Sequence, residues 1–221
     1  NNSQFHVLKK LTEGQAITTL EGLKALLNNN KAVDEPITVA ACDNAILYNH
    51  DQWGQSCDNN DWDIIVWGGL NHVNARRRPE MFGWIDYDLK TLDISNISVK
   101  KPIDDSLSHS IVIGMFTFRN ADILQQCIEA LVAKNHRINN EFYLDSAINE
   151  ALKIGYRCKI FNVDHFISFG TPNDLRTFEY WQSCFHKWDV HPYNLKIDSK
   201  VPKKAINNLE SKFSTFNENS Y

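Results

Sequence analysis

One short apolar run, followed by an acid and an amide, constrains this chain more than any other stretch. Residues 37–41 are β-branched or small. They follow Pro36, and Cys42 separates them from Asp43 and Asn44. This pattern predicts a buried parallel strand. Ligands of open α/β sheets bind outside the carboxyl ends of such strands, so Asp43 is a candidate to hold a hard cation against a phosphate. A plain strand-ending turn at Asp43-Asn44 explains the same residues equally well.

The composition excludes several classes of partner. The 221 residues are 43% hydrophobic and 11% aromatic, which is ample for a packed core. The formal net charge is -4, from 23 basic and 27 acidic residues without a basic block, so neither nucleic acid nor an anionic membrane is an expected partner. The sequence shows no membrane span, no signal peptide and no initiating Met. We therefore expect a cytoplasmic chain whose numbering could begin inside a longer protein.

The cysteines are expected to be reduced. They are odd in number, widely separated, and contain no C-x-x-C pair, which argues against a disulfide framework and against a zinc site. Their positions are Cys42, Cys57, Cys127, Cys158 and Cys184.

Apolar periodicity predicts alternating helices and strands, which is the rhythm of a doubly wound α/β sheet. Helices are predicted from an apolar stripe at residues 16–27, at 121–133, at 142–154 with Gly155 as C-cap, and from Thr171 to about residue 185. Strands are predicted at residues 62–68, 110–118 and 157–163, and an inserted antiparallel hairpin at 83–88 and 93–99. Residues 49–60 are polar and predict a surface loop. We expect one domain at residues 1–188, and a peripheral helix and tail at 189–221.

Seven short motifs follow one another in a specific order. They are Glu-Gly-Gln-Ala at 13–16, Cys-Asp-Asn at 42–44, Pro-Glu-Met-Phe-Gly-Trp at 79–84, Val-Lys-Lys-Pro at 99–102, Ile-Gly-Met-Phe at 113–116, Asn-Glu-Phe-Tyr-Leu-Asp at 140–145, and Phe-Gly-Thr-Pro at 169–172. Over residues 11–181 this series resembles the sugar-nucleotide pyrophosphorylases of the glucose-1-phosphate thymidylyltransferase type. These nucleotidyltransferases join a nucleoside triphosphate to a sugar 1-phosphate and release pyrophosphate.

The resemblance implies a fold, a set of ligands and a role for each matched residue. The fold would be a Rossmann-like, doubly wound mixed sheet of the nucleotidyltransferase (GT-A-like) type with the inserted hairpin. The ligands would be Mg²⁺, a nucleoside triphosphate and a sugar 1-phosphate, in polysaccharide biosynthesis, and a homo-oligomer is left open. Asp43 would bind the metal and act in catalysis together with Lys101. The other substrate-binding residues would be Gln15, Asn44, Gly83, Lys100, Gly114, Glu141 and Thr171.

Two departures from the family pattern concern catalysis. Ser168 stands where the family has a second metal-binding Asp, and Asp164, four residues upstream on the same face of an expected strand, could substitute for it. The Gly-rich loop that cradles the triphosphate is absent, since only residues 1–10 precede the first motif. The shortfall is about two βα units, roughly 60 residues. We therefore expect this chain by itself to release pyrophosphate negligibly.

Other interpretations remain open at this stage. Lys100 and Lys101 could be solvated residues at the edge of the hairpin, and Glu141 could be an acid that stabilises a helix start through the helix dipole. His186 and His191 are expected to be surface residues rather than metal ligands. A metal-dependent glycosyltransferase would usually show Asp-x-Asp, and Asp43-Asn44-Ala45 lacks the second acid. A non-catalytic binding module is favoured by Ser168 and by the missing loop.

Overall fold

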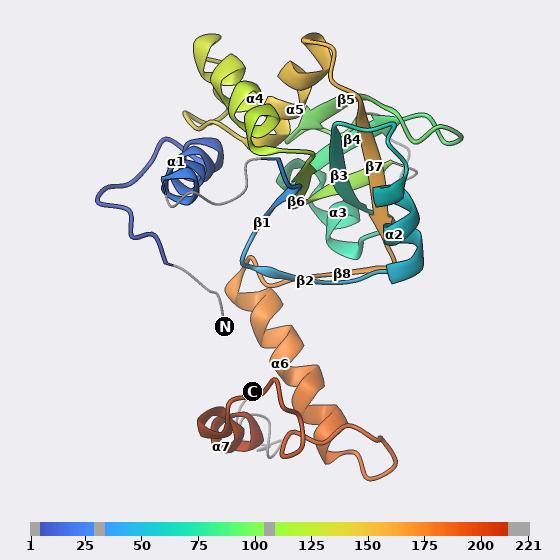
Figure 1. Ribbon diagram of the computed structural model, residues 1–221. Helices are drawn as coiled ribbons and strands as arrows, with labels where there is room; N and C mark the ends of the chain where they lie inside the picture. The colour runs from blue at the N-terminus through green and yellow to red at the C-terminus, as the bar shows by residue number, and fades with distance from the viewer. Residues whose placement is uncertain (1–4, 29–33, 104–108, 212–221) are drawn as a thin grey trace. The chain divides into compact units, whose positions relative to one another are not determined.

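A six-stranded mixed sheet organises the computed structural model, which describes residues 5–28, 34–103 and 109–211 (Figure 1). The strand order is β5-β4-β6-β3-β7, and β1 pairs with β6 off this path. Within this sheet, as far as the structure describes it, only β3 and β7 pair in parallel. The strands are β1 (Ile37–Ala40), β3 (Ile64–Gly69), β4 (Gly83–Tyr87), β5 (Ile94–Val99), β6 (Ser110–Phe118) and β7 (Cys158–Val163). The predicted mixed α/β sheet and the β4–β5 hairpin are both confirmed.

Helices cover both faces of this sheet, as the doubly wound prediction required. Along β3, Ile64 and Val66 join one buried cluster, whereas Ile65 and Trp67 join the other, which is the alternation expected of a strand. The first cluster includes residues of α1 (Gln15–Leu27), α4 (Ala121–Ala133) and α5 (Leu144–Lys153). Short helices contribute to the second cluster: α2 (His50–Asp58) packs Trp53 against it and α3 (Val73–Arg77) supplies Ala75. A 3₁₀ turn, η1 (Pro79–Met81), leads from α3 into β4.

Capping residues lie at the predicted start of α4 and at the predicted end of α5. Asn120 caps α4 by accepting a hydrogen bond from the Ile123 backbone N–H, at the predicted start. Gly155 follows α5 with a φ of 97°, the left-handed conformation that favours glycine at a C-cap. α4 therefore begins, and α5 ends, where the sequence supplies a cap-forming residue.

The expected parallel pairing of the strand before Asp43 is wrong. β1 pairs with β6 in antiparallel register, from Ile37 opposite Phe118 to Ala40 opposite Met115. Its residues are alternately half-buried and exposed, not buried throughout. Because β6 runs opposite to both β1 and β3, β1 still points the same way as β3 and β7. The direction of the strand was predicted correctly, and its partner and burial were not.

The expected surface loop at residues 49–60 is largely a helix. The Asn49 side chain caps α2 by accepting hydrogen bonds from the backbone N–H groups of Asp51 and Gln52, at 2.9 and 3.0 Å. The Trp53 ring lies 4.4 Å from that of Trp67, measured between centroids, and so anchors α2 on the sheet. The polar composition concealed one partly buried aromatic residue, whose packing against the sheet is enough to hold a short helix in place.

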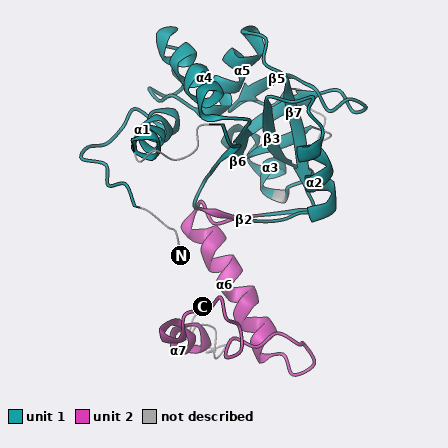
Figure 2. Cartoon of the chain, viewed as in Figure 1, with its two compact units in different colours: residues 1–42, 46–166 teal, residues 43–45, 167–221 magenta. Residues whose placement is uncertain are grey.

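The chain divides into two compact units (Figure 2). The first comprises residues 1–42 and 46–166, and the second residues 43–45 and 167–221. In the second unit, Thr171 caps α6 (Pro172–Lys187) as predicted, and the His186 Nε2 lies 3.1 Å from Glu210 of α7 (Lys203–Ser211). The described part of the chain contains no helix with the length and apolarity to cross a membrane.

Candidate functional site

The edge of β6 is shared by two strands, which brings two predicted glycines into one region. β1 follows β6 as far as Met115, after which the Ala41 backbone N–H donates to the Gly114 carbonyl at 2.9 Å. β4 takes over farther along the same edge, with Trp84 opposite Ile111. Gly114 has a φ of 73°, which favours glycine and allows β6 to change course between the two partners. The carboxyl end of β1 and the amino end of β4, which begins at Gly83, thus meet along one strand.

Gly83 is needed because a carboxyl group occupies the space beside its α-carbon. A Cβ at this position would collide with Asp145 Oδ2 and would lie 3.2 Å from Val112 Cγ2. Asp145 projects from the first turn of α5. The Pro-Glu-x-aromatic-Gly turn and the Glu-Phe-Tyr-Leu-Asp segment are therefore in contact through these two residues.

Asp145 is a half-buried acid with little internal compensation. Burial raises the pKa of its carboxyl to about 6, and the nearby Lys100 ammonium limits the rise. Within the described part of the chain, the carboxyl forms no ion pair and accepts a hydrogen bond only from its own backbone N–H. The sequence motif contained this residue but did not distinguish it, since its burial depends on Gly83.

The two lysines after β5 differ in their surroundings. Lys100 has a φ of 59°, and its Nζ donates to the Met81 carbonyl at 2.7 Å and lies 5.7 Å from the Tyr143 ring centroid. Lys101 is exposed, and no described residue pairs with its ammonium. Lys100 therefore borders the Asp145 region, whereas the Lys101 ammonium has no such contact among the described residues.

Backbone hydrogen bonds join the Glu-Gly-Gln-Ala motif at 13–16 to the Asn-Glu-Phe-Tyr-Leu-Asp motif at 140–145. Phe142 donates its N–H to the Glu13 carbonyl at 2.9 Å, and its carbonyl accepts from the Ala16 N–H at 3.0 Å. A Cβ on Gly14 would lie 2.8 Å from the Phe142 backbone nitrogen, so glycine permits this approach. Gln15 is half-buried at the start of α1, and Glu141 is exposed on the turn before Phe142. Burial first, and then the Glu141 carboxylate, raise the pKa of the neighbouring Tyr143.

Asp43 and the Phe-Gly-Thr-Pro turn come together in the second unit. The Phe169 N–H donates to the Asp43 carbonyl at 2.7 Å, next to the pairing of β2 (Asn44–Leu47) with β8 (His165–Ser168). A Cβ on Gly170 would lie 3.2 Å from Asp43 Oδ2 and 3.5 Å from Ser168 Oγ. The Asp43 carboxylate and the Ser168 hydroxyl thus flank the same glycine.

These oxygens suit a cation that arrives with its own ligands. Among the described residues, no three His, Cys, Asp or Glu side chains are grouped to hold a metal ion. Mg²⁺ usually takes one or two protein carboxylates and completes its octahedron with phosphate oxygens and water. Asp43, with the Ser168 hydroxyl nearby, fits that mode.

The strand argument for Asp164 is wrong. β7 ends at Val163 and β8 begins at His165, so Asp164 lies at an exposed bend and does not share a strand face with Ser168. Its role as a second metal ligand remains a prediction.

The remaining predicted residues have local roles. Thr171 Oγ1 accepts from the Asp174 N–H at 3.2 Å and donates to the Asp174 carboxylate at 2.8 Å, so its hydroxyl is engaged in capping α6. Asn44 is half-buried at the start of β2. His186 pairs with Glu210, and the His191 ring stacks on Phe185 with 4.5 Å between the ring centroids.

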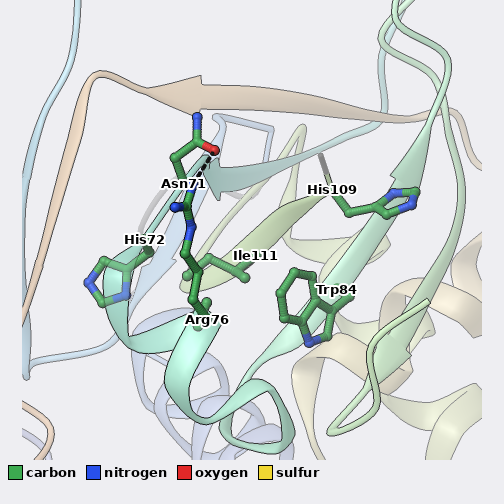
Figure 3. Close-up of a pocket in the computed structure, with 8 residues that line it drawn as sticks. Asn71, His72, Arg76, Trp84, His109 and Ile111 are labelled. Carbon is green, nitrogen blue, oxygen red and sulfur yellow. Dashed lines mark hydrogen bonds between the residues drawn. The ribbon is translucent and has the colours of Figure 1, made fainter. Parts of the chain in front are cut away.

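A small polar hollow at the carboxyl end of β3 was not expected from the sequence (Figure 3). Arg76 reaches toward Asn71, with 3.4 Å between Nη2 and Oδ1, while Trp84 and Ile111 also line the hollow. Its volume is only about 10 Å³. That is room for about one water molecule.

Solved structures share this fold. A nucleoside-diphosphate-sugar pyrophosphorylase from Vibrio cholerae RC9 matches with a TM-score of 0.60 and 17% identity over 77% of this chain and 66% of that one. An apo UDP-glucose pyrophosphorylase matches with 0.58 and 19% over 80% and 63%. An inositol-1-phosphate CTP transferase from T. maritima matches with 0.52 and 14% over 76% and 60%.

The structural neighbours are thus sugar nucleotidyltransferases and pyrophosphorylases, and this chain has their fold. It spans less than two thirds of the length of the chains that it matches. No family model matches the sequence, and neither does any curated protein.

Proposed function

We propose that the protein acts as a nucleotidyltransferase that joins a nucleoside triphosphate to a sugar 1-phosphate, giving a nucleoside-diphosphate sugar and pyrophosphate for polysaccharide biosynthesis. The observation that carries the proposal is the contact between the Gly83 turn and the Glu141–Asp145 segment, two motifs from distant parts of the sequence, in a chain with the nucleotidyltransferase fold. Cytoplasmic location and self-association are part of the same proposal.

The reaction requires positioning and charge neutralisation more than covalent help. A phosphate oxygen of the sugar phosphate attacks the α-phosphorus, and the bond to the pyrophosphate leaving group breaks. Lys101, assisted by Lys100, would hold the sugar phosphate, and Glu141 would accept hydrogen bonds from sugar hydroxyls. Gln15 and Gly14 would border the base. Asp43 would hold Mg²⁺, which neutralises phosphate charge when bound.

A non-catalytic binding module is the second candidate. It is favoured by Ser168, a neutral hydroxyl where a second carboxylate would strengthen metal binding. Such a module would bind a sugar phosphate or a nucleotide without turnover. A glycosyltransferase gains no support, since Asn44 and Ala45 follow Asp43 without a second acid.

The test is a matrix of nucleoside triphosphates and sugar 1-phosphates with Mg²⁺, monitored for pyrophosphate release on the longest natural form of the protein. We expect release with one base and a narrow set of sugars. Calorimetric binding of a sugar phosphate without release would favour the binding module. Absence of both binding and release across the matrix would contradict the proposed function.

A further inference from the structure

We propose that Asp145 is a second sugar-binding carboxylate beside Glu141, and that it accepts hydrogen bonds from hydroxyl groups of the sugar phosphate. This inference rests on the proposed function and names a residue that its motif comparison did not assign. It concerns binding and specificity, not the transfer of the nucleotidyl group.

The first support is the position of the carboxyl group. Asp145 Oδ2 occupies the space that a side chain at Gly83 would fill. A ligand that lies against the Gly83 turn would therefore meet the Asp145 carboxyl. Glycine at position 83 leaves room for the acid, which fills the space that a side chain would take.

The second support is the contrast with acids that have structural partners. The Glu150 side chain is 1% exposed, and its carboxylate pairs with Lys134 and Lys153. Buried charges are normally paired in this way. Asp145, although half-buried, has no such partner among the described residues. No described side chain therefore uses the acceptor capacity of its carboxylate.

The third support is the balance of charge around Asp145. Lys100 faces it from the end of β5 and Tyr143 from the segment before α5, whereas Gly83 and Val112 on β4 and β6 carry no charge. An acid whose nearest lysine already donates its Nζ hydrogen to the Met81 carbonyl favours neutral hydroxyl donors over a second anion. The ligand group next to Asp145 is thus a hydroxyl and not the phosphate.

The carboxyl changes state within an accessible pH range, because its pKa is raised to about 6. Above that value both oxygens accept hydrogen bonds, and below it one oxygen carries a proton. Affinity for a polyhydroxyl ligand should therefore rise as the pH increases from about 5 to 7.5.

Calorimetric titrations with glucose, galactose, mannose and N-acetylglucosamine 1-phosphates would test this inference, with inorganic phosphate as the reference that lacks sugar hydroxyls. Asp145→Asn should weaken the best of the four at pH 7.5 by about 10-fold, and should leave inorganic phosphate unchanged. Asp122→Asn, which removes the acid in the first turn of α4, is the matched control and should bind like the wild type. An unchanged affinity in Asp145→Asn would overturn the inference alone.

Failure of the proposed function looks different. If none of the four sugar phosphates binds the wild type better than inorganic phosphate does, sugar recognition itself is absent and both proposals fall. If Asp145→Asn does not fold, the wild type still decides: its affinity for the sugar phosphate relative to methyl phosphate, a monoester that titrates over nearly the same pH range but lacks sugar hydroxyls, should rise several-fold between pH 5 and 7.5. A flat ratio would overturn the role of Asp145.

Discussion

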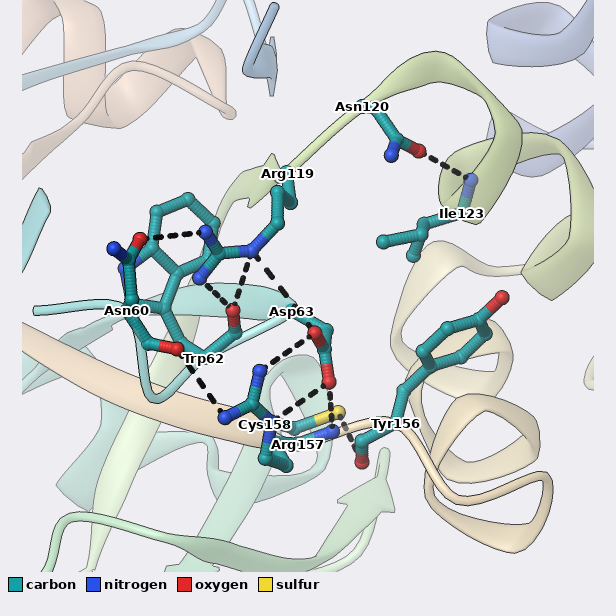
Figure 4. Close-up of polar contacts among 9 residues, drawn as sticks. All are labelled: Asn60, Trp62, Asp63, Arg119, Asn120, Ile123, Tyr156, Arg157 and Cys158. Carbon is teal, nitrogen blue, oxygen red and sulfur yellow. Dashed lines mark hydrogen bonds and ion pairs between the residues drawn. The ribbon is translucent and has the colours of Figure 1, made fainter. Parts of the chain in front are cut away.

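Two aspartates near opposite ends of β6 show how differently one residue type can be used. Asp145 lies by Val112 and Gly83, has no ion-pair partner among the described residues, and has its pKa raised by burial. Asp63 lies by Arg119, which follows β6, and the Arg157 side chain and backbone donate to its carboxylate (Figure 4). Those hydrogen bonds lower the pKa of Asp63. An acid whose partners are built into the chain is structural, and an acid that lacks them is available for a ligand.

Further contacts of Arg119 stabilise the end of β6 that lies next to Asp63. Arg119 Nε donates to the Trp62 carbonyl at 2.7 Å, its guanidinium lies 4.4 Å from the Trp62 ring centroid, and Nη1 donates to Asn60 Oδ1 at 3.0 Å. Its backbone N–H donates to the Asp63 carbonyl at 2.9 Å. This network ties the starts of β3 and β7 to the end of β6, so we expect it to contribute stability and not binding.

The largest expected effect on activity comes from a third aspartate, Asp43. Like Asp145, it has no ion-pair partner in the described chain. Asp43→Asn should lower kcat/KM for pyrophosphate release by about 100- to 1,000-fold in the longest natural form, because a neutral amide leaves the cation uncompensated. Its melting temperature should stay near that of the wild type, since Asp43 is exposed. Near-normal turnover would remove Asp43 from the metal site.

At the Asp63 end of β6, which we call the structural end, Asp63→Ala should lower the free energy of unfolding by about 2 to 3 kcal/mol at pH 7. The reason is that Arg119 and Arg157 lose a charged partner. Urea denaturation would measure the loss. Asp122→Ala, a change of an exposed acid on α4, serves as the control. Stability within about 0.5 kcal/mol of the wild type would show that the network is dispensable.

We call the region of Asp145, Gly83 and the Glu141 segment the ligand end. There, Glu141→Ala should weaken sugar-phosphate binding by roughly 1 to 3 kcal/mol and leave nucleotide affinity nearly constant. Glu129→Ala on α4 is a matched exposed control, expected to change neither affinity. Equal losses for sugar phosphate and nucleotide would point to a structural role for Glu141.

The pH dependence of stability should have opposite signs for the two aspartates. The pKa of Asp63 is depressed, so its stabilisation is present above about pH 4 and is lost as the pH falls through the folded-state value. The pKa of Asp145 is raised to about 6, so ionisation costs stability as the pH rises from about 4 to 6.

Asp145→Asn should therefore be more stable than the wild type at pH 7.5 by about 1 to 2 kcal/mol, allowing for partial exposure. The difference should disappear near pH 3.5. A loss of stability in this variant at pH 7.5 would mean that the carboxylate has a favourable partner in the folded protein.

How far the sequence could predict this structure depends on the range of the interaction. Some features involve only neighbours in the chain, such as the Thr171 cap of α6 and the turn at Gly155, and these were predicted correctly. The pairing of β1 with β6 and the packing of Trp53 against Trp67 depend on distant strands, and both were missed. Likewise, Asp63 and Arg157 are 94 residues apart, so nothing local identifies that pair.

The candidate site divides in the same way. Residue types such as Asp43 and Glu141 could be nominated from motifs. The unusual state of Asp145 could not, because it depends on a glycine that reaches it only in the folded sheet. The structure also brings the Asp43 segment to the Phe-Gly-Thr-Pro turn, a contact that order along the chain alone does not specify.

The most direct test of the two-ended account compares Asp63→Asn and Asp145→Asn at pH 7.5, each by thermal melting and by calorimetric titration with the sugar 1-phosphate that binds the wild type best. We predict that Asp63→Asn melts about 5 to 10 °C lower and, measured well below its midpoint, binds normally. Asp145→Asn should melt at or above the wild-type temperature and bind about 10-fold more weakly. If the same variant lost both stability and affinity, or if Asp145→Asn lost neither, the division between a structural end and a ligand end would be contradicted.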